Sequence, residues 1–172
     1  MKFFYIICFI FLSLINTVIA NNNIIFIDMD KVILTSKVGS SMMKQLNKIN
    51  NDNLKKFKDN EKIFKDKEKK LVNQKNILTE EKFKISLNEL RLEVNEYNKD
   101  RNTIIVNFNK LKNNNTNKLL KLINPILAEY AKDNSIAIIL KKKNLIMGIT
   151  ELDITDKIIK IVDKNIKEFK VN

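Results

Sequence analysis

The sequence contains no histidine and no tryptophan, and its 172 residues include only one cysteine, one proline and two glycines. The missing histidine and the scarcity of cysteine remove the side chains that most often serve as general bases and nucleophiles. Two glycines cannot form a phosphate-cradling loop or a dinucleotide fingerprint. Ser–Lys or paired-carboxylate chemistry is compatible with the composition, but no pattern places such groups in a pocket. We therefore predict that the protein is not an enzyme and uses no cofactor.

Asp28 and Asp30 form the one short motif that suggests a metal or acid–base site. Two carboxylates without a histidine, a cysteine or a third ligand nearby fall short of a metal shell, so we predict neither a metal site nor catalytic residues. One of the two aspartates is expected to cap a short helical segment from Lys31 to Thr35. The residues 24–27 that precede them are large and apolar, which predicts a short buried strand.

The N-terminus has the pattern of a secretory signal over residues 1–20. Lys2 precedes the short apolar run 3–15, and the segment ends in a small residue, so cleavage is expected after Ala20. A membrane anchor is the alternative, but the run is shorter than the ~20 apolar residues of a spanning helix. Cys8 lies inside this run, so the exported chain would contain no cysteine and no disulfide.

The chain is basic, with 32 lysines and arginines against 20 acidic residues and a net charge of +12. Only Arg91 and Arg101 are arginines, so bidentate recognition of phosphate does not explain the basic excess. The positive electrostatic field of the lysines attracts acidic partners over about 10 Å. It is also compatible with weak contact with anionic lipid or a membrane surface. Nucleic acid is not expected as a physiological partner, because arginine is scarce and the chain carries an export signal.

A stretch without glycine extends from residue 40 to residue 133 and carries a mostly apolar residue at every seventh position. This spacing places the side chains in one narrow seam along a helix. The first half contributes Met43, Asn50, Phe57, Phe64, Leu71 and Leu78. The second half contributes Phe83, Leu90, Tyr97, Ile104 and Leu111, with a second register of Leu87, Val94, Phe108 and Leu122 that Arg101 and Asn115 interrupt.

The chain is expected to reverse at residues 76–79. Thr79 precedes Glu80 and Glu81, a pattern typical of a helix N-terminus. The companion positions of the first helix are polar, so its seam is about half as wide as the face that a globular helix buries; they are Asn53, Asn60, Lys67 and Gln74. At ~1.5 Å per residue the helix reaches on the order of 55 Å, which exceeds a compact core. We predict that residues 40–115 form an antiparallel two-helix arm that projects into solvent.

Local signals bound this arm at both ends. Gly39 is expected to form a kink, and Ser40 or Ser41 is expected to cap the first long helix. Pro125 removes a backbone donor, which predicts a kink or a restart of the second helix.

After the arm, residues 136–140 and 145–149 predict two strands of a hairpin joined by a basic turn. A short helix follows, capped by Asp153 or Thr155. Its apolar residues recur at helical spacing; they are Ile158, Ile161, Val162 and Ile166.

The strands predict an α+β fold whose body is completed by oligomerisation. Three short strands are too few for a stable sheet, and their continuous apolar character indicates burial on both faces. The body is expected to comprise residues 21–39 and 116–172. Its association surface is expected to contain Ile25, Phe26, Ile27, Ile138, Ile139, Leu140 and Ile146.

This order of elements resembles the Skp/OmpH family of periplasmic chaperones. The residues that carry the resemblance are the export signal, the opening strand 25–28, Gly39 before a lysine- and glutamate-rich hairpin, the strand 138–140, and Leu-Asp-Ile-Thr at 152–155 before a short helix. The resemblance implies a homotrimer with three helical hairpins around a cavity. It also implies a periplasmic holdase that keeps unfolded outer-membrane proteins soluble without ATP.

On this hypothesis the arm carries the client-binding side chains, which would be Phe57, Phe64, Leu71, Phe83, Leu90 and Tyr97. The alternative is that these residues only pack the two helices together, because apolar stripes at helical spacing are usually packing. A structural coiled-coil subunit of an envelope assembly, without chaperone activity, is the competing function.

Overall fold

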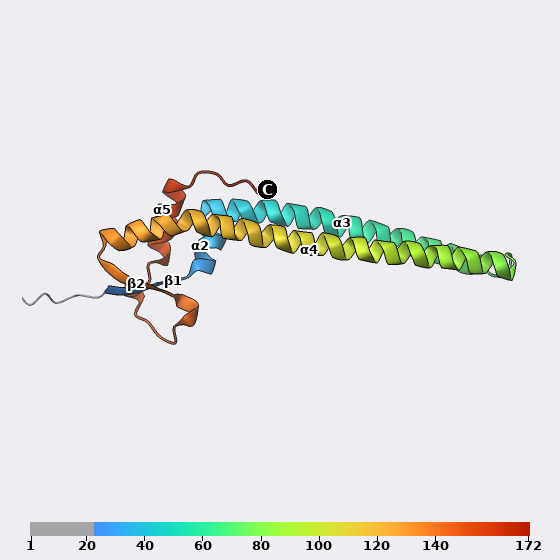
Figure 1. Ribbon diagram of the computed structural model, residues 1–172, viewed down its shortest axis with the longest axis horizontal. Coiled ribbons are helices and arrows are strands. Elements are labelled where there is room, and N and C mark those ends of the chain that lie inside the picture. The colour runs from blue at the N-terminus through green and yellow to red at the C-terminus, as the bar shows by residue number, and fades with distance from the viewer. Residues whose placement is uncertain (1–22) are drawn as a thin grey trace, which may run out of the picture.

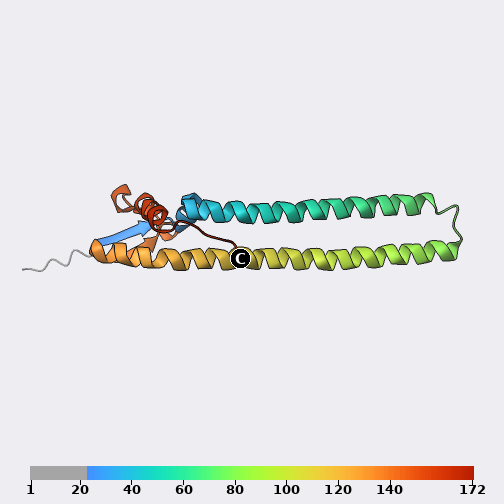
Figure 2. The same ribbon diagram turned by 90° about the horizontal axis from the view of Figure 1, so that it is seen from above.

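The computed structural model describes residues 23–172, in which two long helices form a hairpin with a small head at one end (Figure 1). The helices α3 (Lys37–Asn73) and α4 (Glu80–Asp133) lie side by side in both views (Figures 1 and 2). The signal sequence expected at residues 1–20, with its cleavage site and Cys8, lies outside the described residues. The head contains β1 (Asn23–Ile27), α2 (Met29–Thr35), β2 (Ile136–Lys141) and α5 (Thr155–Asn165).

The reversal at the tip of the hairpin lies where the sequence predicts it. The backbone N–H groups of Ile77 and Leu78 both donate to the Gln74 carbonyl at 3.0 Å, which forms a tight turn. Thr79 caps α4, and its hydroxyl accepts from the Lys82 N–H at 3.4 Å. The capping prediction for Asp28 is also confirmed, because its carboxylate accepts from the Lys31 N–H at 2.9 Å and begins α2.

The start of α3 differs from the expected cap at Ser40 or Ser41. Ser36 is the cap, and its hydroxyl accepts from the Gly39 N–H at 3.2 Å inside the first turn of α3. A Cβ atom at position 39 would lie 1.8 Å from the carbonyl oxygen of Ile33. Gly39 is therefore required by the close approach of α2 to α3 and does not form the predicted kink between separate elements.

Pro125 lies inside α4, which continues as one helix of 54 residues. The expected restart at this proline is wrong. The carbonyl of Lys121 lacks its helical donor, but both residues lie on the exposed side of α4, where water can satisfy that group.

The sheet of the head is a parallel pair, β1 with β2, in which Ile25 is paired with Ile139. The whole helical hairpin is the connection between the two strands, as parallel strands require a long crossover. On its other edge β1 meets the segment before α5, where the Ile154 N–H donates to the Phe26 carbonyl at 3.0 Å.

The expected strand at residues 145–149 is wrong, and so is the strand hairpin. A 3₁₀ turn at Lys142–Asn144 follows β2, and residues 145–149 form a loop that extends away from the helices (Figure 1). The chain turns away from the edge of β2 at Lys142–Asn144, Gly148 lies against the ring of Phe26, and Asp153 and Ile154 then meet the other edge of β1. The loop therefore has no strand beside it within the described chain.

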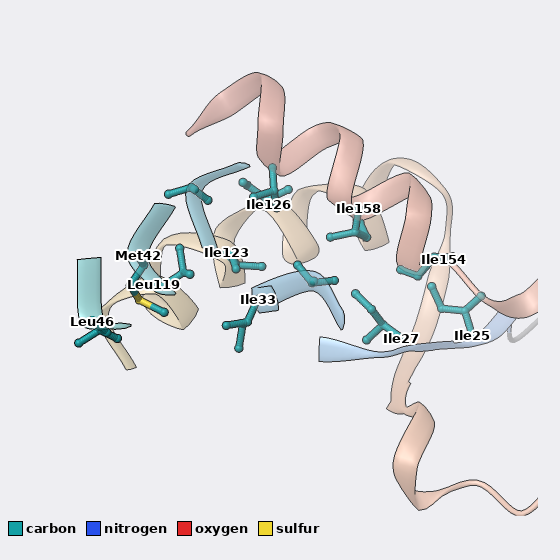
Figure 3. Packing of buried hydrophobic residues seen from close by; sticks show 13 residues of the cluster. Ile25, Ile27, Ile33, Met42, Leu46, Leu119, Ile123, Ile126, Ile154 and Ile158 are labelled. Atoms are coloured by element: carbon teal, nitrogen blue, oxygen red, sulfur yellow. The ribbon is translucent and has the colours of Figure 1, made fainter. Parts of the chain in front are cut away.

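One apolar core joins every element of the head (Figure 3). It includes Met42 and Leu46 from α3 and Leu119 from α4, so the base of the hairpin belongs to the core of the head. Each fully buried side chain of this size contributes about 1.5–3 kcal/mol of transfer free energy. From α5 the core takes Ile158 and Val162, as the helical spacing predicts, and α5 ends just before Ile166.

The N-cap of α5 is Ile154, which makes no side-chain capping bond, so the expected cap at Asp153 or Thr155 is wrong. A polar network instead joins the start of α5 to the residues that follow β1 and β2. Asp153 accepts from Lys142 Nζ at 2.7 Å and from the N–H of Thr155 at 2.9 Å. The Thr155 hydroxyl donates to Asp153 and accepts from the Asp28 N–H at 2.9 Å. Burial raises the pKa of the Asp153 carboxyl, but the hydrogen bonds from Lys142 and Thr155 outweigh it, so the net pKa lies below its ordinary value. The same bond to Asp153 raises the pKa of Lys142.

Replacement of this carboxylate tests the network. We expect Asp153→Ala to lower the free energy of unfolding by about 1–2 kcal/mol at pH 7, because Thr155 and Lys142 lose the carboxylate that accepts their hydrogen bonds. Since the pKa is lower in the folded protein, the carboxylate contributes fully above its unfolded pKa of about 3.9 and loses that contribution as the pH falls through the folded value. Urea unfolding at fixed protein concentration should therefore show a smaller difference at pH 3 than at pH 7.

Asp156→Ala is the matched control, because Asp156 is exposed and its one partner within residues 23–172 is the exposed ammonium of Lys31. This variant should change the free energy of unfolding by no more than about 0.5 kcal/mol. An Asp153→Ala effect that is the same at both pH values would contradict the assignment.

Candidate functional site on the helical arm

The six arm residues expected to bind client all lie between α3 and α4. Phe57 and Leu71 are buried, with 6% and 8% of their surface exposed. The other four, Phe64, Phe83, Leu90 and Tyr97, are partly buried. All six therefore contribute to packing of the hairpin, and the partly buried ones also present part of their surface to solvent.

Tyr97 connects the two helices in the middle of the arm. Its hydroxyl donates to the carbonyl of Phe57 at 3.2 Å, and its ring lies 5.2 Å from the ring of Phe64, centroid to centroid. Burial raises the pKa of Tyr97, the nearby Glu61 carboxylate adds to this effect, and the Arg101 cation opposes it. The phenol therefore remains a neutral donor at physiological pH.

Ion pairs join the helices where the apolar register is interrupted. Arg101 lies 3.8 Å from Glu61, and its guanidinium lies 5.3 Å from the centroid of the Phe57 ring. Lys67 pairs with Glu93 about two helical turns nearer the tip. Exposed pairs of this kind contribute about 0–1 kcal/mol each, so they set the alignment of the helices more than their stability.

A groove of about 790 Å³ lies along the outer half of the arm. Five of the six expected residues line it, and only Phe57 does not. Both arginines of the sequence, Arg91 and Arg101, line the groove, as do Glu61 and Glu68. Its apolar lining comes from both helices and consists of Phe64, Leu71, Val72, Phe83, Leu87, Leu90, Val94 and Tyr97.

The arm also exposes apolar side chains that the seven-residue pattern does not include. Between 50% and 69% of the surface of each of these side chains is exposed; they are Leu54, Ile63, Val72, Ile85, Leu92 and Val106. The signal that could have found them is their position outside both registers, because an apolar residue out of register on a two-helix arm has no partner helix to cover it.

The expected association residues divide into two groups. Ile25, Phe26 and Ile27 on β1 are buried within the chain's own head. Ile139 is partly buried, whereas Ile138 is 48% exposed, Leu140 is 38% exposed and Ile146 is fully exposed. The exposed surface extends along the loop to Met147 and Ile149. The head therefore carries an uncovered apolar surface made of β2 and the loop that follows it.

Within residues 23–172, no group of three or more histidine, cysteine, aspartate or glutamate side chains is placed to hold a metal ion. None of the helices in this part of the chain combines the length and the apolar character needed to cross a bilayer.

Comparison with known proteins identifies the family that has this architecture. The family model described as Outer membrane protein (OmpH-like) matches residues 23–162, which is most of the chain. The chain belongs to the OmpH-like family. A crystal structure from Caulobacter crescentus CB15, described as a candidate outer membrane chaperone (OmpH-like), has the same fold with a TM-score of 0.71. The two chains are 13% identical, and the match covers 86% of this chain and 88% of the other. No curated protein matches the sequence.

Membership in the OmpH-like family agrees with the resemblance drawn from the residues, and the fold confirms the prediction of an α+β protein with a long hairpin and a short C-terminal helix.

Two nearby positions on α3 test the difference between a side chain packed between the helices and a side chain exposed to solvent. We expect Phe57→Ala to lower the free energy of unfolding by about 3 kcal/mol, because it opens a cavity under Tyr97 and Arg101. Leu54→Ala removes a side chain that is 53% exposed and should change it by less than about 1 kcal/mol. Chemical denaturation followed by circular dichroism measures both. Equal effects at the two positions would contradict the assignment of Phe57 to the seam.

Proposed function

We propose that this protein is an ATP-independent holdase that binds unfolded outer-membrane proteins in the periplasm and prevents their aggregation. Its OmpH-like fold supports this function, as does the likeness to a candidate outer membrane chaperone. The observation that carries the proposal is the apolar surface left open on a lysine-rich arm, in the groove and on the outward side chains. No catalytic role is proposed.

This surface suits weak and distributed binding. A client segment that covers part of the groove or one outward side chain gains about 25 cal/mol per Å² of apolar surface removed from water. No single contact is strong, so an unfolded chain can be held at many points and still be released without an energy source. The positive field of the lysines raises the local concentration of acidic clients.

The client-binding side chains of the proposal are those that face the groove, namely Phe64, Leu71, Phe83, Leu90 and Tyr97. Phe57 supports them from inside the seam. In this arrangement residues 40–115 form the working arm, and residues 21–39 and 116–172 form the body that carries it. Export through a signal at residues 1–20, cleaved near Ala20, would deliver the protein to the periplasm.

The body is proposed to associate as a homotrimer through the exposed surface of β2 and its loop. The free edge of β2 and its apolar side chains would be covered by neighbouring copies, which protects an edge that otherwise invites aggregation. Three arms would then surround a common space in which the grooves act on one client.

A structural coiled-coil subunit of an envelope assembly remains the second candidate. It is favoured by the extent of the hairpin, since 37 and 54 residues of helix also suit a spacer. The outward apolar residues distinguish the two functions, because a spacer does not need them.

The holdase proposal is tested by diluting a urea-unfolded β-barrel membrane protein into buffer and following its aggregation by light scattering. The full-length protein at equimolar ratio should suppress the scattering. Removing residues 57–70 and 90–103, which lie opposite one another and comprise two heptads each, should abolish most of the suppression. Full suppression by this shortened variant would exclude the arms as the working surface.

A pair of double variants tests the role of the outward apolar side chains without changing the length of the arm. Ile63→Ser with Leu92→Ser removes two outward side chains and should weaken suppression several-fold, whereas the exposed polar control Asn51→Ser with Asn107→Ser should not. If the unaltered protein fails to suppress aggregation, the holdase proposal is wrong and the structural role is favoured.

The trimer is tested by native mass spectrometry of the exported chain. The expected mass is three times that of one chain. Ile138→Lys combined with Ile146→Lys should shift the protein to the monomer, whereas Ile105→Lys on the arm should leave it unchanged. A monomer at micromolar concentration without any substitution would overturn the proposal.

A further inference from the structure

The segment 166–172 follows α5 as extended chain and crosses the base of the hairpin, where it ends over α3 and α4 (Figures 1 and 2). It belongs neither to a helix nor to a strand of the head. Two side-chain amides hold it in place, one from each long helix.

Gln45 on α3 binds the backbone of the segment at alternate residues. Its Nε2 donates to the Phe169 carbonyl at 2.8 Å, and its Oε1 accepts from the Val171 N–H at 3.1 Å. The amide thereby supplies the donor and the acceptor that a neighbouring β-strand would supply.

Asn115 on α4 makes the second pair of bonds. Its Oδ1 accepts from the Asn172 N–H at 3.4 Å, and its Nδ2 donates to the Asn172 backbone oxygen at 3.3 Å and to the Leu111 carbonyl at 2.8 Å. Lys118 Nζ adds a bond to the Asn172 side-chain oxygen at 2.8 Å and lies 3.4 Å from its backbone oxygen. Asn115 is fully buried, and its Oδ1 has no other bond among the described residues. A buried amide needs hydrogen-bond partners, and the backbone of the segment supplies them here.

The side chains of the segment divide by position. Ile166, Phe169 and Val171 pack against the core of the head, whereas Lys167, Glu168 and Lys170 are exposed. Phe169 and Val171 alternate with exposed residues, as on a strand that has one apolar face. The bonds from Gln45 and Asn115 to the segment involve only its backbone, so they place no demand on its sequence. Only Lys118 binds a side chain of the segment.

We propose that Gln45 and Asn115 form a binding site for an extended polypeptide segment with alternating apolar side chains, which residues 166–172 fill until a strand of an unfolded β-barrel protein replaces them. The site rests on the proposed holdase function for its partner. Strands of outer-membrane barrels alternate apolar and polar residues, so they match both the backbone clamp and the one-sided apolar contact.

Residues 166–172 compete with the client for this site. Because this segment is attached to α5, its effective concentration at the site is high, and a client gains access only to the fraction of molecules whose site is open. Clients that also contact the arm can displace it, whereas short soluble peptides cannot. The site at the base of the hairpin would then hold client only when the arm is already engaged.

The test uses the full chain without residues 166–172 and a fluorescent synthetic peptide of that sequence, Ile-Lys-Glu-Phe-Lys-Val-Asn. Fluorescence anisotropy should show that the shortened chain binds the peptide at least about tenfold more tightly than the complete chain, whose site is occupied. A peptide of the same composition with its apolar residues adjacent should bind more weakly. A urea-unfolded β-barrel protein diluted into the mixture should release the bound peptide.

Gln45→Ala in the shortened chain should weaken peptide binding about tenfold, the effect of losing two hydrogen bonds. Gln74→Ala at the tip is its matched control. Asn115→Ala should act like Gln45→Ala, with exposed Asn113→Ala as control. Gln45 is only partly buried, so its variant keeps the test valid if Asn115→Ala does not fold.

Equal binding of the peptide by the complete and shortened chains, or by Gln45→Ala and Gln74→Ala, would overturn the inference. A protein that suppresses aggregation but whose bound peptide is not released by the unfolded barrel would also overturn it, and would leave the holdase function intact. Failure of suppression in the separate light-scattering experiment would count against the proposed function itself.

Discussion

The structure depends on one constraint, which is the narrow width of the apolar seam between α3 and α4. On α3 the companion positions of the seam are polar, so Phe57 and Leu71 are its only buried residues beyond the base of the hairpin. A helix with so little apolar surface is covered by one partner and no more. The long helices therefore remain an arm, and the core that stabilises the protein is confined to the head.

The head is stabilised by contacts between segments that are distant in the sequence. β1 pairs with β2 across the entire hairpin, and Ile154 completes the other edge of β1. Met42 and Leu119 extend the core into the base of the arm. The hairpin is thus both the crossover of the sheet and the surface proposed to bind client, so the outer arm can vary in sequence without altering the head.

The sequence predicted the features that depend on local spacing. The hairpin, its reversal at Thr79, the cap at Asp28 and the last helix all follow from periodicity and capping residues within a few positions. The sequence could not predict the choices made by distant contacts. The run 145–149 has the composition of a strand, but the chain follows it as a loop that leads to the other edge of β1, where Ile154 bonds to Phe26. Ser36, not Ser40, begins α3 because Gly39 lets Ile33 approach closely. From the sequence, Asn115 could be identified only as an interruption of the apolar seam. Its bond to Asn172 could not be predicted, because the two residues are far apart in the chain.

The claim that the helices form an extended arm in solution is tested most directly by small-angle X-ray scattering of the purified protein. The 54 residues of α4 predict a maximum dimension of at least about 80 Å, at ~1.5 Å per residue. A chain of this size folded as one compact globule would have a radius of gyration of about 15 Å. Scattering that matches the compact globule would contradict the account, because the seam would then be covered by more than one partner.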